Sequence, residues 1–214
     1  MARKSMIGHW DSYYKDWPKG QIGLYGQGTL CLLGYEWMKD CSLIEDWGCG
    51  RGYFQWLCKP GQCVNLDCSC TPWADKQVDL VEYTSSVPGI MMRSVLEHND
   101  EWETILRNAL ASFTERMALV IATPFGDRQI DVLVHPEAPF YSFSMSQITS
   151  VIDSCQAKWH FHDVPITDGM FPYEHIFYIW KEPAGSPRKR EFEILAEHSK
   201  NPAELSRLYE PKQS

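Results

Sequence analysis

An apolar segment that runs directly into closely spaced glycines is the feature of this sequence that most limits its fold. Residues 42–47 are followed by Gly48, Gly50 and Gly52. Glycine lets the backbone take positive φ angles and pass close to a ligand, where a Cβ atom would clash. A helix that begins after such a turn points free backbone N–H groups at the ligand. The segment therefore predicts a strand, a nucleotide-binding turn and a helix.

An acidic residue further along the chain supports this interpretation. Asp67 closes a second short strand, predicted over residues 62–66, at about the separation at which a carboxylate accepts the ribose hydroxyls. The dinucleotide fingerprint places its third glycine three residues after the second, but Tyr53 stands there and Gly52 follows Gly50 by two. The spacing thus argues against a dinucleotide.

Beyond Asp67, apolar segments alternate with helical patterns. The predicted elements are strands over 77–80, 89–96, 117–122, 157–164 and 176–181 and helices over 101–113 and 144–155. Residues 68–74 are too few, and too rich in cysteine with a proline, for a full crossover helix. The last two strands have no helix between them and should form an antiparallel hairpin. We therefore predict an α/β fold with a doubly wound, mostly parallel seven-stranded sheet that ends in this hairpin.

Two motifs together resemble a known family. The Asp-x-Gly-x-Gly-x-Gly pattern at 46–52 and the Leu-Glu-His run at 96–98 have the order and separation found in class I S-adenosylmethionine-dependent methyltransferases, and the resemblance spans about residues 10–181. It implies S-adenosylmethionine as cofactor, with ribose binding at Asp67 and adenine binding at Asp79, for which Asp75 is a rival. The implied cofactor contacts are Asp46, Gly48, Cys49, Gly50, Gly52, Asp67, Cys68, Asp79, Leu80, Arg93 and Ser94.

The chain divides into a core and two flanking segments of the same domain. Residues 1–41 hold many aromatic residues and a helical pattern over 29–39, for which Thr29 can serve as N-cap. Within this segment Tyr14 or Tyr25 either closes over the methionine end of the cofactor or only packs the first helix on the sheet. Residues 42–182 form the methyltransferase core, and the polar residues 183–214 form a tail with a peripheral helix around 189–198.

Methyl transfer from a sulfonium requires alignment of a nucleophile and, for a hydroxyl acceptor, a base that removes its proton. The loops after the fourth and fifth predicted strands and the hairpin loop should gather beyond the carboxyl ends of the strands. The candidate catalytic residues in these loops are His98, His135 and Glu174. The long segment 124–143 has no clear secondary structure and is a candidate substrate loop.

Composition limits the partners and the location. The formal charge of −8 gives no electrostatic footprint for nucleic acid. No apolar run approaches the length of a membrane span or a signal core, so we expect a cytoplasmic protein without membrane contact. Four of the eight cysteines lie close together, but they lack the Cys-x-x-Cys spacing of a zinc site, and we predict no metal. The oligomeric state is left open.

Three functions follow from these features. The first is an S-adenosylmethionine-dependent methyltransferase that acts on a small-molecule or glycan acceptor, with oxygen as the favoured acceptor atom. The alternatives are a dinucleotide-dependent oxidoreductase and a catalytically silent partner protein that binds S-adenosylmethionine. The glycine spacing separates the first two, whereas only turnover separates the first from the third.

Overall fold

One twisted sheet organises the molecule. The computed structural model describes residues 2–15, 28–126, 140–166 and 171–200. In this part of the chain the strands are β1 (Ile44–Trp47), β2 (Cys63–Asp67), β3 (Lys76–Gln77), β4 (Val87–Arg93), β5 (Phe113–Ile121), β6 (Lys158–Pro165) and β7 (Tyr173–Trp180). They form a 7-stranded sheet in the order β3-β2-β1-β4-β5-β7-β6. The strands β1 to β5 are parallel, and β7 runs antiparallel to both β5 and β6, which confirms the predicted sheet and hairpin.

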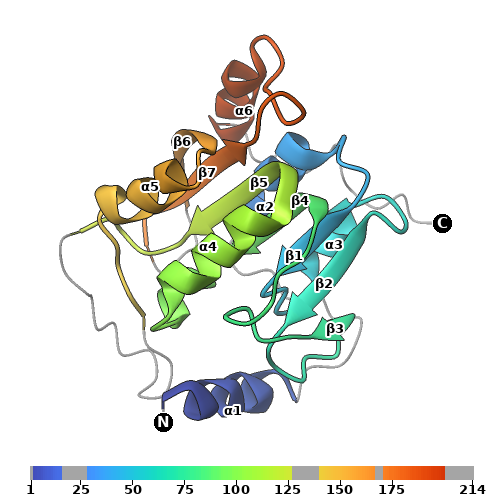
Figure 1. Cartoon of the computed structure of the whole chain (residues 1–214), viewed down its shortest axis with the longest axis vertical. Helices are drawn as coiled ribbons and strands as arrows, with labels where there is room; N and C mark the ends of the chain where they lie inside the picture. The colour runs from blue at the N-terminus through green and yellow to red at the C-terminus, as the bar shows by residue number, and fades with distance from the viewer. Residues whose placement is uncertain (1, 16–27, 127–139, 167–170, 201–214) are drawn as a thin grey trace.

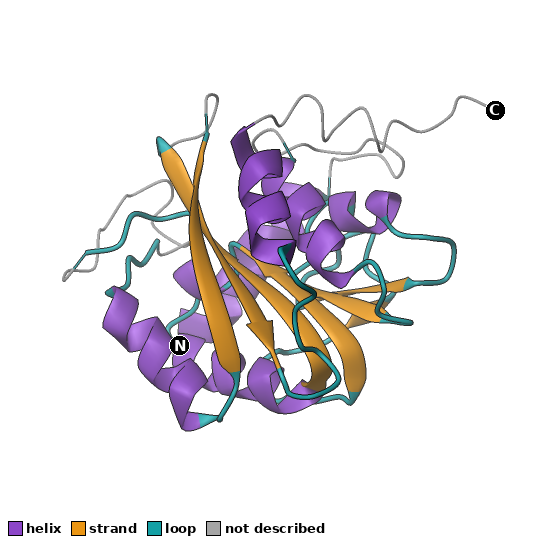
Figure 2. Cartoon of the chain, turned by 90° about the horizontal axis from the view of Figure 1, so that it is seen from above, coloured by secondary structure: helices purple, strands orange, loops and turns teal. Residues whose placement is uncertain are grey.

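Helices cover both faces of the sheet (Figure 2). They are α1 (Ala2–Tyr14), α2 (Thr29–Met38), α3 (Tyr53–Leu57), α4 (Trp102–Ser112), α5 (Met145–Ser154) and α6 (Glu191–Lys200), with a short 3-10 helix η1 (Leu96–His98). One apolar cluster packs α4 and α5 on the first face, and a second packs α2, α3 and α6 on the other. The sheet is therefore buried on both sides, as parallel strands usually are.

Local signals explain most element boundaries. Helix α5 begins with the capping box that its sequence contains, since Ser144 and Gln147 exchange side-chain to backbone hydrogen bonds. Helix α2 differs from our expectation, because its N-cap is Gly28, with φ of 66°, and Thr29 lies inside the helix. The third strand is also shorter than predicted and ends at Gln77, before Asp79. No helix lies between β2 and β3, as the short segment after Asp67 predicts.

The N-terminal helix α1 is the element that the sequence did not predict. Figure 1 shows it lying across the end of the sheet toward which the arrowhead of β2 points. Its sequence contains Gly8 and lacks a continuous apolar stripe, so periodicity gives little sign of a helix. In the described part of the chain, no helix has both the length and the apolar character needed to cross a bilayer.

Two histidines of β6 face helix α6 instead of solvent. The His160 ring stacks on Phe192 with a centroid distance of 4.1 Å, and His162 Nε2 lies 2.7 Å from Ser199 Oγ. Burial lowers the pKa of both histidines below the usual value. Neighbouring charges act as well: His162 affects the pKa of His160, and Asp163 and Lys200 affect the pKa of His162.

We predict that acid loosens helix α6. The folded-state pKa values of both histidines are lowered, so their contacts with α6 favour the neutral rings. This stabilisation is complete above the unfolded pKa of about 6.5 and is lost as pH falls through the folded pKa values. Hydrogen exchange of α6 amides, corrected for intrinsic rates, should therefore lose protection between about pH 7 and pH 5. The double variant His160→Gln/His162→Gln should lose this pH dependence. Equal pH dependence in the variant would show that other groups control α6.

Candidate cofactor site

The glycine turn after β1 has the positive φ angles that its sequence predicts. Gly48, Gly50 and Gly52 have φ angles of 76°, 51° and 66°. A Cβ atom on Gly48 would lie 2.4 Å from Val95 Cγ2, so even alanine would clash there as well as being strained. Helix α3 follows directly but has only five residues, little more than one turn. The N–H groups of the turn are themselves bonded, those of Gly48 and Cys49 to the Leu66 carbonyl and that of Gly50 to Asp67, so the turn offers a ligand its shape and not a set of free donors.

Asp67 ties this turn to the end of β2. Its Oδ2 accepts the Gly50 N–H at 3.0 Å, and its Oδ1 accepts both the N–H and the hydroxyl of Ser69, at 2.9 and 2.7 Å. The side chain is buried, yet it lies at the carboxyl edge of the sheet, where open α/β sheets bind their ligands. Asp75, the rival of Asp79 for the adenine contact, accepts the Asn65 N–H at 2.8 Å, a structural bond within the sheet edge.

Helix α1 lies over the glycine turn and the end of β2. The Asp11 Oδ1 accepts the Cys70 N–H at 2.6 Å, and the Tyr13 hydroxyl accepts a hydrogen bond from Arg51 at 2.9 Å. Tyr14 is buried, and its hydroxyl would lie 2.8 Å from a Cβ atom on Gly50. The structure thus places Tyr14 against the predicted cofactor turn. Tyr25, the other candidate of this segment, lies outside the described residues.

A second acid sits beneath the turn. Asp46 is buried at the end of β1, and burial together with the nearby Asp67 raises its pKa to about 7, against the opposing effect of Arg93. The adjoining thiols are poor nucleophiles. Burial raises the pKa of Cys68 to about 12 and that of Cys49 further still.

The candidates around β4 and β7 are held by partners. The Arg93 guanidinium donates to both carboxylate oxygens of Glu174, at 2.9 to 3.2 Å. Both side chains are largely buried. This bidentate pair argues against Glu174 as the catalytic base and makes it the residue that positions Arg93. Ser94 follows with a φ of 52°, which is unusual for a residue with a side chain, and turns the chain toward η1.

The Leu-Glu-His run forms η1, and its two polar residues, Glu97 and His98, have different surroundings. Glu97 is fully buried, and its Oε1 accepts the Ala122 N–H at 2.5 Å, which joins the loops after β4 and β5. Burial raises the Glu97 pKa to about 7, and the Ala122 N–H acts in the opposite direction. Next to it, His98 is half-buried and lies between Trp10 and Phe140, with ring centroids 5.0 and 4.6 Å away. Of Glu97 and His98, only His98 is partly exposed at the carboxyl edge of the sheet.

The remaining candidate residues lie at the edges of the site. Asp79 is half-buried, with Oδ1 accepting the Val81 N–H at 3.0 Å, and Leu80 is buried in the core. His135 lies outside the described residues. One pair was not anticipated from the sequence: His175 Nδ1 lies 2.6 Å from Asp163 Oδ1. The hairpin contains the signal for this pair, because its register places Asp163 opposite His175.

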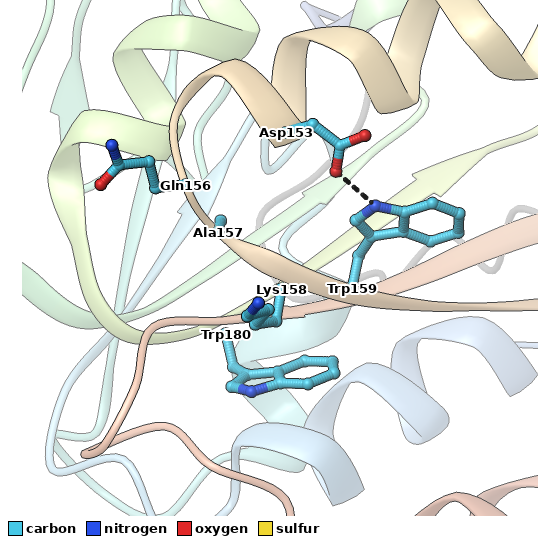
Figure 3. Close-up of a pocket in the computed structure, with 6 residues that line it drawn as sticks. All are labelled: Asp153, Gln156, Ala157, Lys158, Trp159 and Trp180. Carbon is cyan, nitrogen blue, oxygen red and sulfur yellow. Dashed lines mark hydrogen bonds between the residues drawn. The ribbon is translucent and has the colours of Figure 1, made fainter.

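A separate hollow lies at the opposite end of the sheet. It has a volume of about 430 Å³ and is lined by Asp153, Gln156, Ala157, Lys158, Trp159 and Trp180 (Figure 3). The Trp159 indole donates to Asp153 at 2.9 Å. Because Trp180 pairs with Arg116 near the start of β5, this hollow is remote from the carboxyl edge and from the glycine turn. In the described ranges, no group of His, Cys, Asp and Glu residues could hold a metal ion.

Comparisons with solved structures identify the fold. Neither a protein-family model nor a curated protein sequence matches the chain. The magnesium protoporphyrin IX methyltransferase of Synechocystis PCC 6803, solved with bound S-adenosylhomocysteine, matches with a TM-score of 0.63 and 14% identity over 85% of this chain and 100% of its own. The 1,6-didemethyltoxoflavin-N1-methyltransferase of Burkholderia thailandensis matches with a TM-score of 0.67 and 13% identity over 84% and 89%.

A third match carries a different activity in its name. The [4+2]-cyclase SpnF matches with a TM-score of 0.51 and 12% identity over 75% of this chain and 72% of its own. These likenesses show that the chain has the fold of the class I S-adenosylmethionine-dependent methyltransferases. At 12–14% identity the likeness concerns the fold alone.

Proposed function

We propose that this chain is an S-adenosylmethionine-dependent methyltransferase that methylates a small-molecule acceptor, at an oxygen atom of a sugar or another metabolite. The observation that carries this proposal is the Asp67 carboxylate bonded to the Gly50 N–H at the carboxyl edge. The left-handed glycine turn has no side chains at Gly48, Gly50 and Gly52 to keep a nucleoside from its backbone, and the carboxylate stands beside it for the ribose hydroxyls. The residues present therefore fit the cofactor.

Each group around the turn has a role in this proposal. Bound S-adenosylmethionine would supply a methyl group already activated on sulfonium. Gly48 and Gly50 would face the cofactor with their backbone, Asp46 would attract its ammonium group, and Tyr14 would close over the same end. The Arg93–Glu174 pair would fix the wall beneath them. Because alignment supplies most of the rate, a single positioned base suffices for a hydroxyl acceptor.

The most direct test is turnover. Purified chain should be incubated with methyl-labelled S-adenosylmethionine and a panel of sugars, phenols, amines and acids. We expect label to appear in an oxygen-bearing product, together with S-adenosylhomocysteine. Asp67→Ala serves as the inactive control. Tight cofactor binding without transfer to any acceptor would favour a silent binding protein or another reaction on this fold, as the name of the cyclase suggests for that neighbour.

We predict that His98→Ala lowers turnover on an oxygen acceptor about a hundredfold, since general-base help is typically of this size. His98 is the last residue of η1, at the carboxyl edge of the sheet, where the acceptor and the cofactor should meet. Cofactor affinity should stay within a few-fold, because the change acts in the transition state. Turnover near that of the unaltered chain would leave alignment alone as the source of the rate.

We predict opposite effects of Asp46→Asn on binding and on stability. The raised pKa of about 7 means that the folded state holds this proton more firmly than the unfolded state does. The acid therefore costs stability as pH rises through 7, and Asn should increase the free energy of unfolding at pH 8.

A cationic cofactor favours the ionised acid, so affinity should fall as pH drops below about 7, and Asn should weaken it about tenfold at pH 8. Calorimetry and urea unfolding measure both effects. Unchanged affinity would place Asp46 outside the cofactor site.

A further inference from the structure

A continuous row of aromatic rings runs along the carboxyl edge. We call it the aromatic row, and its members are Tyr14, Trp10, His98, Phe140 and Phe171. Successive ring centroids along this order lie 5.9, 5.0, 4.6 and 6.0 Å apart. The rings come from α1, from η1, from the segment that precedes α5 and from the segment that precedes β7. Chain segments far apart in sequence thus bring their rings to one place.

The aromatic row lies outside the two apolar clusters that pack the sheet. Neither of the two apolar clusters in the described ranges includes any of its members. Tyr14 is buried, but Trp10, His98, Phe140 and Phe171 are each only half-buried. Large rings are usually buried to stabilise a fold, and a gathered set left partly open is more typical of a binding site.

The position of the row relates it to the reaction. One end is Tyr14, whose hydroxyl lies against Gly50 in the glycine turn. The other end is Phe171, just before β7, on the far side of the sheet centre from β2. A molecule lying along the row would therefore extend from the cofactor turn toward the hairpin. This is the direction in which an acceptor must approach a methyl group.

In the described part of the chain, three polar side chains beside the row have hydrogen-bond partners within the protein. Asn99 Nδ2 donates to the Val95 carbonyl at 2.5 Å, and the Tyr141 hydroxyl donates to Asp100. Glu97 is fully buried, where its Oε1 accepts the Ala122 N–H and its Oε2 is enclosed without a hydrogen-bond partner among the described residues. A sugar carries a hydroxyl on nearly every carbon and needs a matching set of polar partners. A flat ring needs mainly ring faces and edges, which the row supplies.

We propose that the aromatic row binds the acceptor and that the acceptor is a planar aromatic molecule, such as a phenol or a fused-ring hydroxyl compound. This inference rests on the proposed function and narrows its acceptor from small molecules in general. Ring-to-ring contacts hold the acceptor plane, and His98 within the row lies where an acidic aromatic hydroxyl would release its proton. The oxygen then forms a bond to the methyl carbon, the carbon–sulfur bond breaks, and its electron pair stays on sulfur.

Calorimetry with matched probes tests this proposal even though the natural acceptor is unidentified. The probes are naphthol, the fully saturated decalin alcohol of the same skeleton, and methyl glucoside, each titrated with and without saturating S-adenosylhomocysteine. We expect naphthol to bind at least about tenfold more tightly than either other probe. The variants Trp10→Leu and Phe140→Leu should each weaken naphthol binding about tenfold.

The control variant is Trp56→Leu, because Trp56 is 55% exposed on α3 and lies outside the aromatic row. It should bind naphthol like the unaltered chain, and melting curves must show that all three variants are folded. Equal binding of naphthol and its saturated analogue, stronger binding of the glucoside, undetectable naphthol binding at millimolar concentration, or unchanged binding in folded row variants would overturn the proposal. Absence of S-adenosylhomocysteine binding would instead contradict the proposed function, and the naphthol titration without it keeps the two failures apart.

Discussion

Asp67→Ala is expected to weaken binding of S-adenosylhomocysteine by about 1.5–3 kcal/mol, because hydrogen bonds to a charged acceptor contribute about this much. The carboxylate is the proposed ribose acceptor and also holds the Gly50 N–H in the glycine turn. Loss of both functions acts in the same direction on affinity. Calorimetry of the folded variant measures the effect.

The structure also supplies the control for this variant. Asp75 is an acid of the same loop, but it is exposed and bonded to the Asn65 backbone, so Asp75→Ala should leave affinity within a few-fold. Asp67→Ala should in addition lower stability, since three internal donors lose their acceptor. Normal affinity in a folded Asp67→Ala protein would move the ribose contact elsewhere.

Arg116→Ala is expected to lower the free energy of unfolding by about 3–5 kcal/mol, as breaking a buried ion pair usually does. The Arg116 guanidinium bonds both oxygens of Glu191, at 2.7 and 3.1 Å, and lies 4.0 Å from the Trp37 ring centre. It also donates to the carbonyls of Trp37, Gly185 and Ser186. Its removal leaves the Glu191 carboxylate buried without its main partner and releases the segment before α6.

Urea unfolding measures this loss, with an exposed ion pair as control. Arg107 and Glu103 form an i,i+4 pair on α4 with side chains 46% and 53% exposed, so Arg107→Ala should change stability by less than about 1 kcal/mol. The double variant Arg116→Met/Glu191→Leu should recover part of the loss, because no charge is then left buried. A similar small effect for Arg107→Ala and Arg116→Ala would show that the buried pair contributes no more than a surface one.

The sequence predicts the sheet well because its signals are local. The apolar segments, the glycine turn at 48–52 and the absence of a helix between β6 and β7 each constrain one strand or connection. Helix α1 has no such signal, since its sequence lacks an apolar stripe and its identified contacts to Arg51 and Cys70 lie far along the chain. The sequence therefore offers Tyr14 as a residue over the cofactor but gives no sign of the helix that carries it.

The site was predicted in part for the same reason. Gly48 and Gly50 follow from the spacing of the glycine motif and Asp67 from the end of the second predicted strand, and the structure brings them together at the carboxyl edge. The partner of Glu174 was not predictable in this way, because Arg93 lies 81 residues earlier in the chain and only the completed sheet brings the two side chains together. The bond from Glu97 to the Ala122 N–H likewise depends on two loops that meet only in the fold.

One titration tests the central claim most directly. The purified chain should be titrated by calorimetry with S-adenosylhomocysteine and, in parallel, with NAD⁺ and NADP⁺. The glycine turn and Asp67 predict binding of S-adenosylhomocysteine in the micromolar range, about −8 kcal/mol, and no saturable binding of either dinucleotide. Saturable binding of a dinucleotide with no response to S-adenosylhomocysteine would contradict the account.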